Sequence, residues 1–249
     1  MRRKHVLSFI ALLALAVAAA LVVLPASWLA AALPAHWPLA IVDTQGTVWK
    51  GTAAVAIGPA HQRRRLSEPL RWEWSFSRGP QLAIQHRWLS GPLTLALTPT
   101  GLAVSAQTLS VPAGALATLD ARLAAVGPEG RLTIRWPTLR FSPSLPAPGT
   151  RLLDAEWRDA ASALAPIRPL GHYTLSMTAG DGSSELQLAS RQGPLLLEGK
   201  GGFNARQGLD FTGTARADPT ANEAVHRALQ DVLGALGPRQ NNVTLLRLR

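Results

Sequence analysis

The stretch Arg131-Leu132-Thr133-Ile134-Arg135-Trp136 alternates strictly between polar and apolar side chains. In an extended chain successive side chains point to opposite faces, so the apolar three share one face and the polar three share the other. This period predicts a β-strand with one buried face and one face in water. Similar patterns recur after residue 40, at 82–88, 93–97, 173–177, 185–188, 209–215 and 243–248.

Glycine and proline separate these segments. The chain has 249 residues with 21 Gly and 19 Pro, and pairs such as Gly91-Pro92, Gly127-Pro128 and Gly193-Pro194 stand between the predicted strands. Such short separations favour antiparallel neighbours joined by tight turns over parallel strands with helical crossovers. We therefore predict a mainly β fold, an extended and curved antiparallel sheet with one or two short helices.

Two segments show helical spacing instead. Apolar residues at 114–126 predict a short helix. A second helix is predicted at about 219–236, where Thr220 and Glu223 have the spacing of a capping box and Gly237-Pro238 ends the pattern. We expect this helix to cover one end of the sheet, although its apolar stripe is also typical of a membrane-surface or partner-binding face.

The N-terminus joins a positive segment, Arg2-Arg3-Lys4, to a run from Val6 to Leu24 that is apolar except for Ser8. A helix of this length is about 28 Å long, close to the roughly 30 Å hydrocarbon core of a bilayer. A removable signal sequence has a shorter apolar region of about 7–15 residues. We predict an uncleaved transmembrane anchor at 6–24, with cleavage after Ala18-Ala19-Ala20 as the alternative.

The positive segment also predicts orientation, because Lys and Arg flanking a span tend to stay in the cytoplasm. Residues 1–5 then form a cytoplasmic stub, 25–40 a juxtamembrane segment and 41–249 a β-rich domain across the membrane. Trp28 and Trp37 lie either at the membrane interface or at the start of the folded core. In a bacterium with two membranes, this is a single-pass inner-membrane protein with a periplasmic domain.

The chain is basic, with a formal net charge of +10, of which three charges belong to Arg2, Arg3 and Lys4. An excess of this kind favours anionic lipid head groups or an acidic partner, and it is also typical of solvated strand faces. Arg63-Arg64-Arg65 is the densest charge run of the body, and it is either an interaction patch or a loop between two strands. Nucleic acid is not expected, because aromatic residues are not interleaved with the basic ones.

No catalytic or cofactor motif is recognisable. None of the six histidines stands in an HxH or HExxH arrangement, and the absence of cysteine excludes disulfides and cysteine nucleophiles. Lys200-Gly201-Gly202 fits neither a phosphate loop nor a dinucleotide fingerprint. The polar cluster 181–185 is interpreted as a hairpin turn, with a cation or nucleophile site as the alternative. We predict no enzymatic activity, no cofactor, no metal and no small-molecule substrate.

Several segments occur in an order that is typical of one family: Leu24–Leu29, Gly46–Gly51, Gly130–Trp136, Pro169–Tyr173, Gly193–Gly199 and the C-terminal helix with its following strand. With these segments the chain resembles the type II secretion system protein N family. The resemblance implies an accessory inner-membrane component of the machine that exports folded proteins across the outer membrane. Its implied partners are other secretion-system proteins of the inner membrane and periplasm.

The β-rich pattern is also similar to that of AsmA-like envelope proteins. This second resemblance implies a protein that binds or conveys membrane lipid along an apolar sheet face, and it remains the alternative. The protein N family has no catalytic signature, so the resemblance assigns no catalytic residue.

Overall fold

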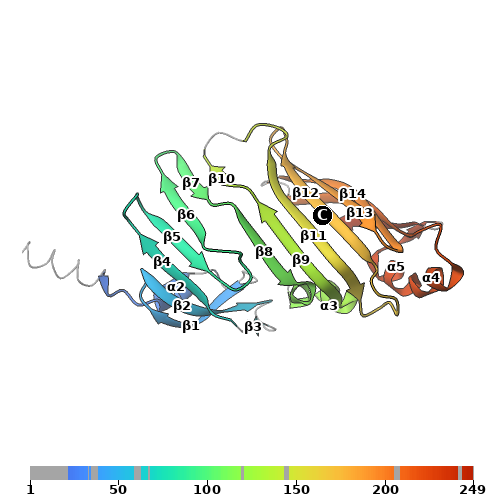
Figure 1. Ribbon diagram of the computed structural model, residues 1–249, viewed down its shortest axis with the longest axis horizontal. Helices are drawn as coiled ribbons and strands as arrows, with labels where there is room; N and C mark the ends of the chain where they lie inside the picture. The colour runs from blue at the N-terminus through green and yellow to red at the C-terminus, as the bar shows by residue number, and fades with distance from the viewer. Residues whose placement is uncertain are drawn as a thin grey trace, which may run out of the picture. The chain divides into compact units, whose positions relative to one another are not determined.

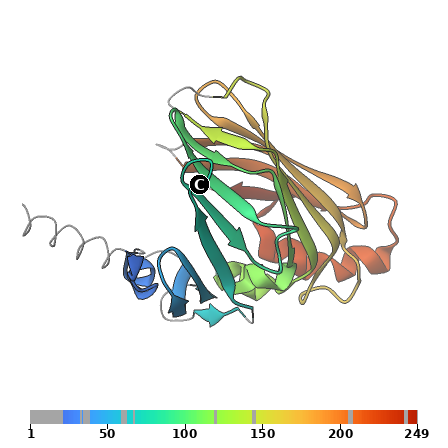
Figure 2. The same ribbon diagram turned by 60° about the vertical axis from the view of Figure 1, so that its left-hand side comes forward.

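The computed structural model describes residues 22–32, 34, 39–58, 63–66, 68–118, 121–142, 146–204, 208–240 and 243–248. The chain divides into two compact units, Met1–His86 and Arg87–Arg249. Strands make up most of both units (Figures 1 and 2). Each unit is described by itself.

The first unit is a small antiparallel sheet with one short helix. Its elements are α2 (Ser27–Ala32), β1 (Leu39–Gly46), β2 (Lys50–Ile57), β3 (Arg64–Arg65), β4 (Leu70–Ser75) and β5 (Gln81–Gln85). The strands pair in the order β1-β2-β4-β5, and β3 pairs with the free part of β2. The buried side chains of Ala26, Ala53 and Trp72 form its core.

The turn between β1 and β2 is fixed from two sides. Gly46 has a φ of +91°, a conformation that costs glycine little and other residues more. The indole N–H of Trp72 donates to the carbonyl oxygen of Val48 at 3.0 Å, so the buried ring holds the turn. The segment Gly46–Gly51 that carried the family resemblance is therefore the connection of the β1–β2 hairpin, with its two ends in the strands.

The second unit contains most of the strands. These are β6 (Leu93–Thr98), β7 (Gly101–Val104), β8 (Gln107–Pro112), β9 (Pro128–Trp136), β10 (Leu139–Phe141), β11 (Arg151–Ser162), β12 (Gly171–Ala179), β13 (Ser184–Gln192), β14 (Leu195–Asn204), β15 (Gly208–Ala217), β16 (Arg239–Gln240) and β17 (Val243–Leu248). Its helices are the 3-10 helix η1 (Ala113–Thr118), α3 (Ala121–Val126), α4 (Glu223–Ala228) and α5 (Gln230–Leu236).

Nine of these strands form one sheet in the order β16-β17-β15-β14-β13-β12-β11-β9-β8, with every neighbouring pair antiparallel. In Figure 1, β8, β9, β11 and β12 lie side by side, coloured from green at β8 to orange at β12. β6, β7 and β10 pair with each other and belong to a different sheet. The mainly β, antiparallel fold is therefore confirmed.

The prediction of one single sheet is wrong, because the strands belong to two. The change of sheet between β9 and β10 has a local cause. Pro137 follows Trp136 directly, and proline has no N–H with which to continue a ladder. The chain leaves the nine-stranded sheet there and re-enters the other sheet at Leu139.

The predicted helices are present with different limits. The 114–126 segment divides into η1 and α3, and the 219–236 segment divides into α4 and α5 at Leu229. The predicted capping box is wrong. Asn222 is the N-cap and its side chain accepts from the N–H of Val225 at 3.0 Å, because the hydroxyl of Thr220 is already bound to Asp218 at 2.7 Å.

Most of the predicted anchor lies outside the described residues, which begin at Val22. Among the residues that are described, no helix is long and apolar enough to span a bilayer. The anchor at 6–24, the stub at 1–5 and the cleavage alternative therefore stay predictions. In the predicted juxtamembrane segment, Trp28 lies on α2 with 64% of its surface exposed, so it does not begin the core. Trp37 lies outside the described residues.

Candidate binding surface

The nine-stranded sheet is amphipathic over five neighbouring strands, from β8 to β13. Five aliphatic side chains stand in one continuous row, which we call the central row: Leu109 in β8, Ile134 in β9, Ala155 in β11, Leu175 in β12 and Leu188 in β13. Each is the direct cross-strand partner of the next. Directly opposed residues share a face of the sheet, so the row lies on one face.

Further apolar residues flank the central row on the same face, two residues along each strand. On one side Val111 pairs with Leu132, Leu132 with Trp157 and Trp157 with Tyr173. The rings of Trp157 and Tyr173 are in contact, with centroids 5.8 Å apart. On the other side Met177 pairs with Leu153 and Leu186. The apolar face is therefore several residues deep along each strand.

The opposite face is charged. Glu156 in β11 accepts hydrogen bonds from Arg158 at 2.7 and 3.0 Å and from Arg135 in β9 at 3.5 Å. These bonds, those from Arg158 above all, hold the pKa of the Glu156 carboxyl below its ordinary value of 4.5, against the opposing effect of burial. An antiparallel sheet with one apolar and one charged face presents the charged one to water.

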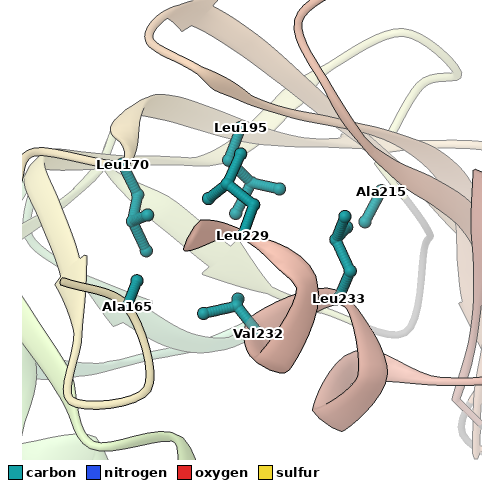
Figure 3. Packing of buried hydrophobic residues seen from close by; sticks show 7 residues of the cluster. All are labelled: Ala165, Leu170, Leu195, Ala215, Leu229, Val232 and Leu233. Atoms are coloured by element: carbon teal, nitrogen blue, oxygen red, sulfur yellow. The ribbon is translucent and has the colours of Figure 1, made fainter. Parts of the chain in front are cut away.

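At one end of the sheet, helices cover the apolar face. Leu229, Val232 and Leu233 of α4–α5 are at most 3% exposed and pack against Leu195 of β14 and Ala215 of β15 (Figure 3). The prediction that the C-terminal helix covers one end of the sheet is confirmed.

Glycines beside this cover let an aromatic ring lie flat on the sheet. A Cβ at Gly199 would clash with the ring of Phe211, and one at Gly201 would lie 2.9 Å from it. Gly199 is the direct partner of Leu188, so this place continues the central row towards the helices. The glycines of this stretch, which fits neither a phosphate loop nor a dinucleotide fingerprint, therefore serve packing within β14.

The central row is less deeply buried than the residues beside the helices. All five of its side chains are half-buried, whereas Leu195 and Ala215 under α4–α5 are at most 3% exposed. Aliphatic side chains in water cost free energy in proportion to their exposed area, at roughly 25 cal/mol per Å². Partly exposed aliphatic groups in a row across five strands are typical of a binding surface. We take this face as the candidate functional site.

A cleft of about 480 Å³ lies beside the edge of the same sheet, with Gln107, Arg135, Arg151 and Asp154 as well as Trp136 and Pro137 among its lining residues. Its polar groups have partners within the protein. The side-chain amide of Gln107 donates to the carbonyl oxygen of Gly91 at 2.8 Å, and Arg151 forms an ion pair with Asp154. The cleft is thus a less favourable ligand site than the apolar face.

The structure places the sequence-predicted site residues as follows. Arg64 and Arg65 form β3 on the edge of β2, so the interpretation as a loop is wrong for these two residues, and Arg65 forms an exposed ion pair with Asp43. The cluster 181–185 contains the predicted turn, in which the N–H of Gly180 donates to the carbonyl of Ser183 at 2.7 Å. Within the described ranges no group of three His, Asp or Glu residues could hold a metal ion.

Comparison with known families gives one match. The model of the family described as type II secretion system (T2SS), protein N, matches residues 37–245. The chain belongs to the type II secretion system protein N family. No curated protein and no solved structure shows a significant match to it.

The protein N family match confirms the resemblance that the sequence suggested. It covers the whole nine-stranded sheet except the last residues of β17, and it includes the central row. Membership identifies the chain as a component of the type II secretion system and so indicates the cell envelope. The sequence suggested an apolar sheet face as the lipid-binding alternative, but it did not identify the residues that form a continuous row. The period-two alternation of apolar residues was visible in each strand. The sequence did not show which strands are neighbours in the sheet.

Proposed function

We propose that this protein is an accessory inner-membrane component of the type II secretion system that acts by binding and not by catalysis. The predicted span 6–24 holds it in the membrane with residues 1–5 in the cytoplasm. The β-rich body then lies in the periplasm, where folded proteins wait for export. Membership of the protein N family supports the role, and the half-buried central row supports binding as its means.

The surface that carries this proposal is the apolar face around Leu175. A partner protein that brings apolar side chains to the central row removes both surfaces from water, which favours association. The charged face around Glu156 stays in water, so the partner is expected to bind to the apolar face and not to the charged one. The expected partners are other secretion-system proteins of the inner membrane and periplasm.

Export by living cells tests the proposal. A deletion strain carries the unsubstituted chain, Leu175→Gln or Ser176→Gln, and secretion of folded exoproteins is measured. Ser176 is the neighbour of Leu175 on the polar face, so it is a matched control. We expect the deletion and Leu175→Gln to impair export and Ser176→Gln to restore it, with equal amounts of each variant in the membrane. Normal export in the deletion strain, or full restoration by Leu175→Gln, would contradict the role.

The same geometry favours a second candidate function, the binding or conveying of membrane lipid. The central row offers aliphatic contacts across five strands, which suits an extended acyl chain as well as a protein surface. This is the AsmA-like alternative.

Photo-crosslinking in living cells separates the two candidates. A photoreactive amino acid replaces Leu175, or Ser176 as the control, and the crosslinked product is identified by mass spectrometry. A lipid adduct at position 175 alone supports the second candidate. A protein adduct at position 175 alone supports the first, and equal labelling at both positions argues against a binding role for the apolar face.

The membrane location has its own test. An anchored chain stays in the membrane fraction after a carbonate wash and keeps its N-terminal residues, as read by mass spectrometry. Recovery of a soluble chain that lacks the residues up to Ala20 would show that the segment is a cleaved signal sequence.

A further inference from the structure

The end of the predicted anchor is bound directly to the first unit. The N–H of Val48 donates to the carbonyl oxygen of Leu24 at 2.9 Å, and the N–H of Ala26 donates to that of Gly46 at 3.1 Å. Between these bonds Pro25 forms a bridge with Thr47. Ala26 is only 2% exposed and belongs to the core of this unit. These bonds attach the turn between β1 and β2 to Leu24, the last residue of the apolar run.

Three aromatic rings follow this turn. Trp49 comes directly after Val48, and its ring meets Trp74 edge-on at 6.4 Å and Phe76 at 5.8 Å between centroids. The rings of Trp74 and Phe76 stack at 6.1 Å. The backbone N–H of Trp74 also donates to the carbonyl of Trp49 at 2.7 Å. We call these three residues the aromatic cluster.

Exposure increases from the core towards this cluster along β4 and the residue that follows it. Trp72 is 6% exposed, Trp74 is half-buried, and Phe76 is 57% exposed. Residues two apart in a strand share a face, so Trp72 and Trp74 lie on one face of β4, and Phe76 comes directly after its last residue, Ser75. The helix α2 lies beside β1, and its Trp28 is also largely exposed. An exposed phenylalanine beside two partly exposed tryptophans is costly in water alone.

We propose that the aromatic cluster Trp49–Trp74–Phe76 is a membrane-docking patch that inserts into the interfacial region of the bilayer holding the anchor. This rests on the anchor of the proposed function. Since Leu24 ends a span long enough for the hydrocarbon core, the turn bound to it lies at the membrane surface. Aromatic rings are favoured there, because one part of each tryptophan is apolar and its N–H still reaches polar groups. The first unit is therefore seated on the membrane.

Fluorescence quenching tests this docking on the full chain. The sequence contains no cysteine, so a single introduced cysteine carries one environment-sensitive dye. The probes are Phe76→Cys, Gln85→Cys and Leu15→Cys, each in vesicles of phosphatidylethanolamine and phosphatidylglycerol that contain nitroxide-labelled lipid. Gln85 is the control, because it lies at the far end of β5 from Gln81, the residue of that strand nearest to Phe76. Leu15 lies in the middle of the predicted span and reports on the anchor alone.

We expect nitroxide at the lipid head group to quench the dye at position 76 several-fold more than at position 85, and aqueous iodide to do the reverse. Ser77→Cys keeps the rings of Trp49, Trp74 and Phe76, and its dye is expected to be quenched like the dye at position 76. It therefore tests the patch even if Phe76→Cys does not fold correctly.

Equal quenching at 76 and 85, with the dye at 15 quenched by acyl-chain nitroxide, overturns the patch and leaves the anchor in place. Shielding of position 76 from iodide without lipid quenching shows that a protein surface covers the cluster, which also overturns the patch. A dye at position 15 that lipid does not quench overturns the anchor, and the docking with it.

Discussion

The hydroxyl of Tyr173 donates to the carbonyl oxygen of Leu195 at 2.9 Å, so a residue near the start of β12 is tied to the first residue of β14. The carbonyl of Leu170 lies 3.2 Å from the same hydroxyl. Tyr173 is only 3% exposed, and burial raises the pKa of its hydroxyl well above the ordinary value of 10.0. The hydroxyl therefore remains a donor throughout the physiological pH range.

Removal of this hydroxyl is expected to destabilise the protein. Tyr173→Phe leaves the ring contact with Trp157 and deletes the hydrogen bond, so the free energy of unfolding should fall by about 0.5–1.5 kcal/mol. Denaturant unfolding of the full chain in detergent, followed by tryptophan fluorescence, measures it. Ser176→Ala removes a hydroxyl from the polar face of the same strand and should change the value by less than about 0.5 kcal/mol. Equal effects would mean that the buried bond adds no stability.

The helical cover of the sheet depends on Leu229. This side chain is 0% exposed and lies at the junction of α4 and α5, against the cluster shown in Figure 3. Leu229→Ala should lower the free energy of unfolding by about 2–5 kcal/mol, because the lost apolar contacts leave a cavity. The exposed neighbour Gln230→Ala is the control, with an expected change within about 0.5 kcal/mol. A small effect of Leu229→Ala would indicate that the helices are only loosely held on the sheet.

The start of α4 gives a test between two capping residues. Asn222→Ala removes the bond to the N–H of Val225 and should cost about 1 kcal/mol. Thr220→Ala, the capping residue suggested by the sequence, should cost less, since its exposed hydroxyl binds Asp218 outside the helix. Hydrogen exchange of the Val225 amide provides a local measurement, which should become faster only in Asn222→Ala. Faster exchange in Thr220→Ala alone would favour the capping box.

These capping residues illustrate where sequence reasoning succeeds and where it fails. The apolar period of two in strands and of 3.6 in helices depends only on residues that are close in the sequence. The strand around Ile134 and the existence of the C-terminal helix could therefore be predicted. The choice of Asn222 over Thr220 depends on a competing bond to Asp218, which pattern spacing does not contain. The same holds for Pro137, whose missing N–H was visible but whose effect on the sheets was not.

The candidate site was harder to predict than the fold. Leu175 is on the apolar face by its own alternation, but its partners Ala155 and Leu188 follow from the register of two hairpins. A shift of one residue in either register would send the partner's side chain to the other face. A single sequence contains no information on such pairings, so the continuous row became visible only in the structure.

The charged face of the sheet predicts a dependence of stability on pH. Hydrogen bonds from Arg158, with the charges of Arg158 and Arg135, lower the pKa of Glu156 below 4.5 in the folded chain. A carboxyl with a lowered folded pKa adds stability that is present above its unfolded pKa and is lost as the pH falls through its folded pKa. Glu156→Gln should therefore destabilise the chain at neutral pH and flatten its loss of stability below pH 4.5.

Unfolding midpoints between neutral pH and about pH 3 measure this effect. Arg158→Gln is the matched variant, because it removes the partner with the largest influence on Glu156. The double variant should lose less stability than the sum of the two single ones, since both remove the same interaction. Fully additive losses would show that Glu156 and Arg158 act independently.

The arginine segment 63–65 remains a predicted interaction patch for an acidic partner or anionic head groups. Replacement of all three by Gln removes the Arg65–Asp43 ion pair, which is exposed, and such pairs contribute at most about 1 kcal/mol. It should reduce the amount of other secretion-system proteins that co-purify from membranes at low salt, and high salt should reduce that amount in the unsubstituted chain as well. The control replaces the exposed Arg131, Arg140 and Arg247 by Gln, with the same change of net charge. If both triple variants co-purify as much secretion-system protein as the unsubstituted chain, the segment is not a binding surface. If both variants lose the same amount, the effect belongs to net charge and not to this segment.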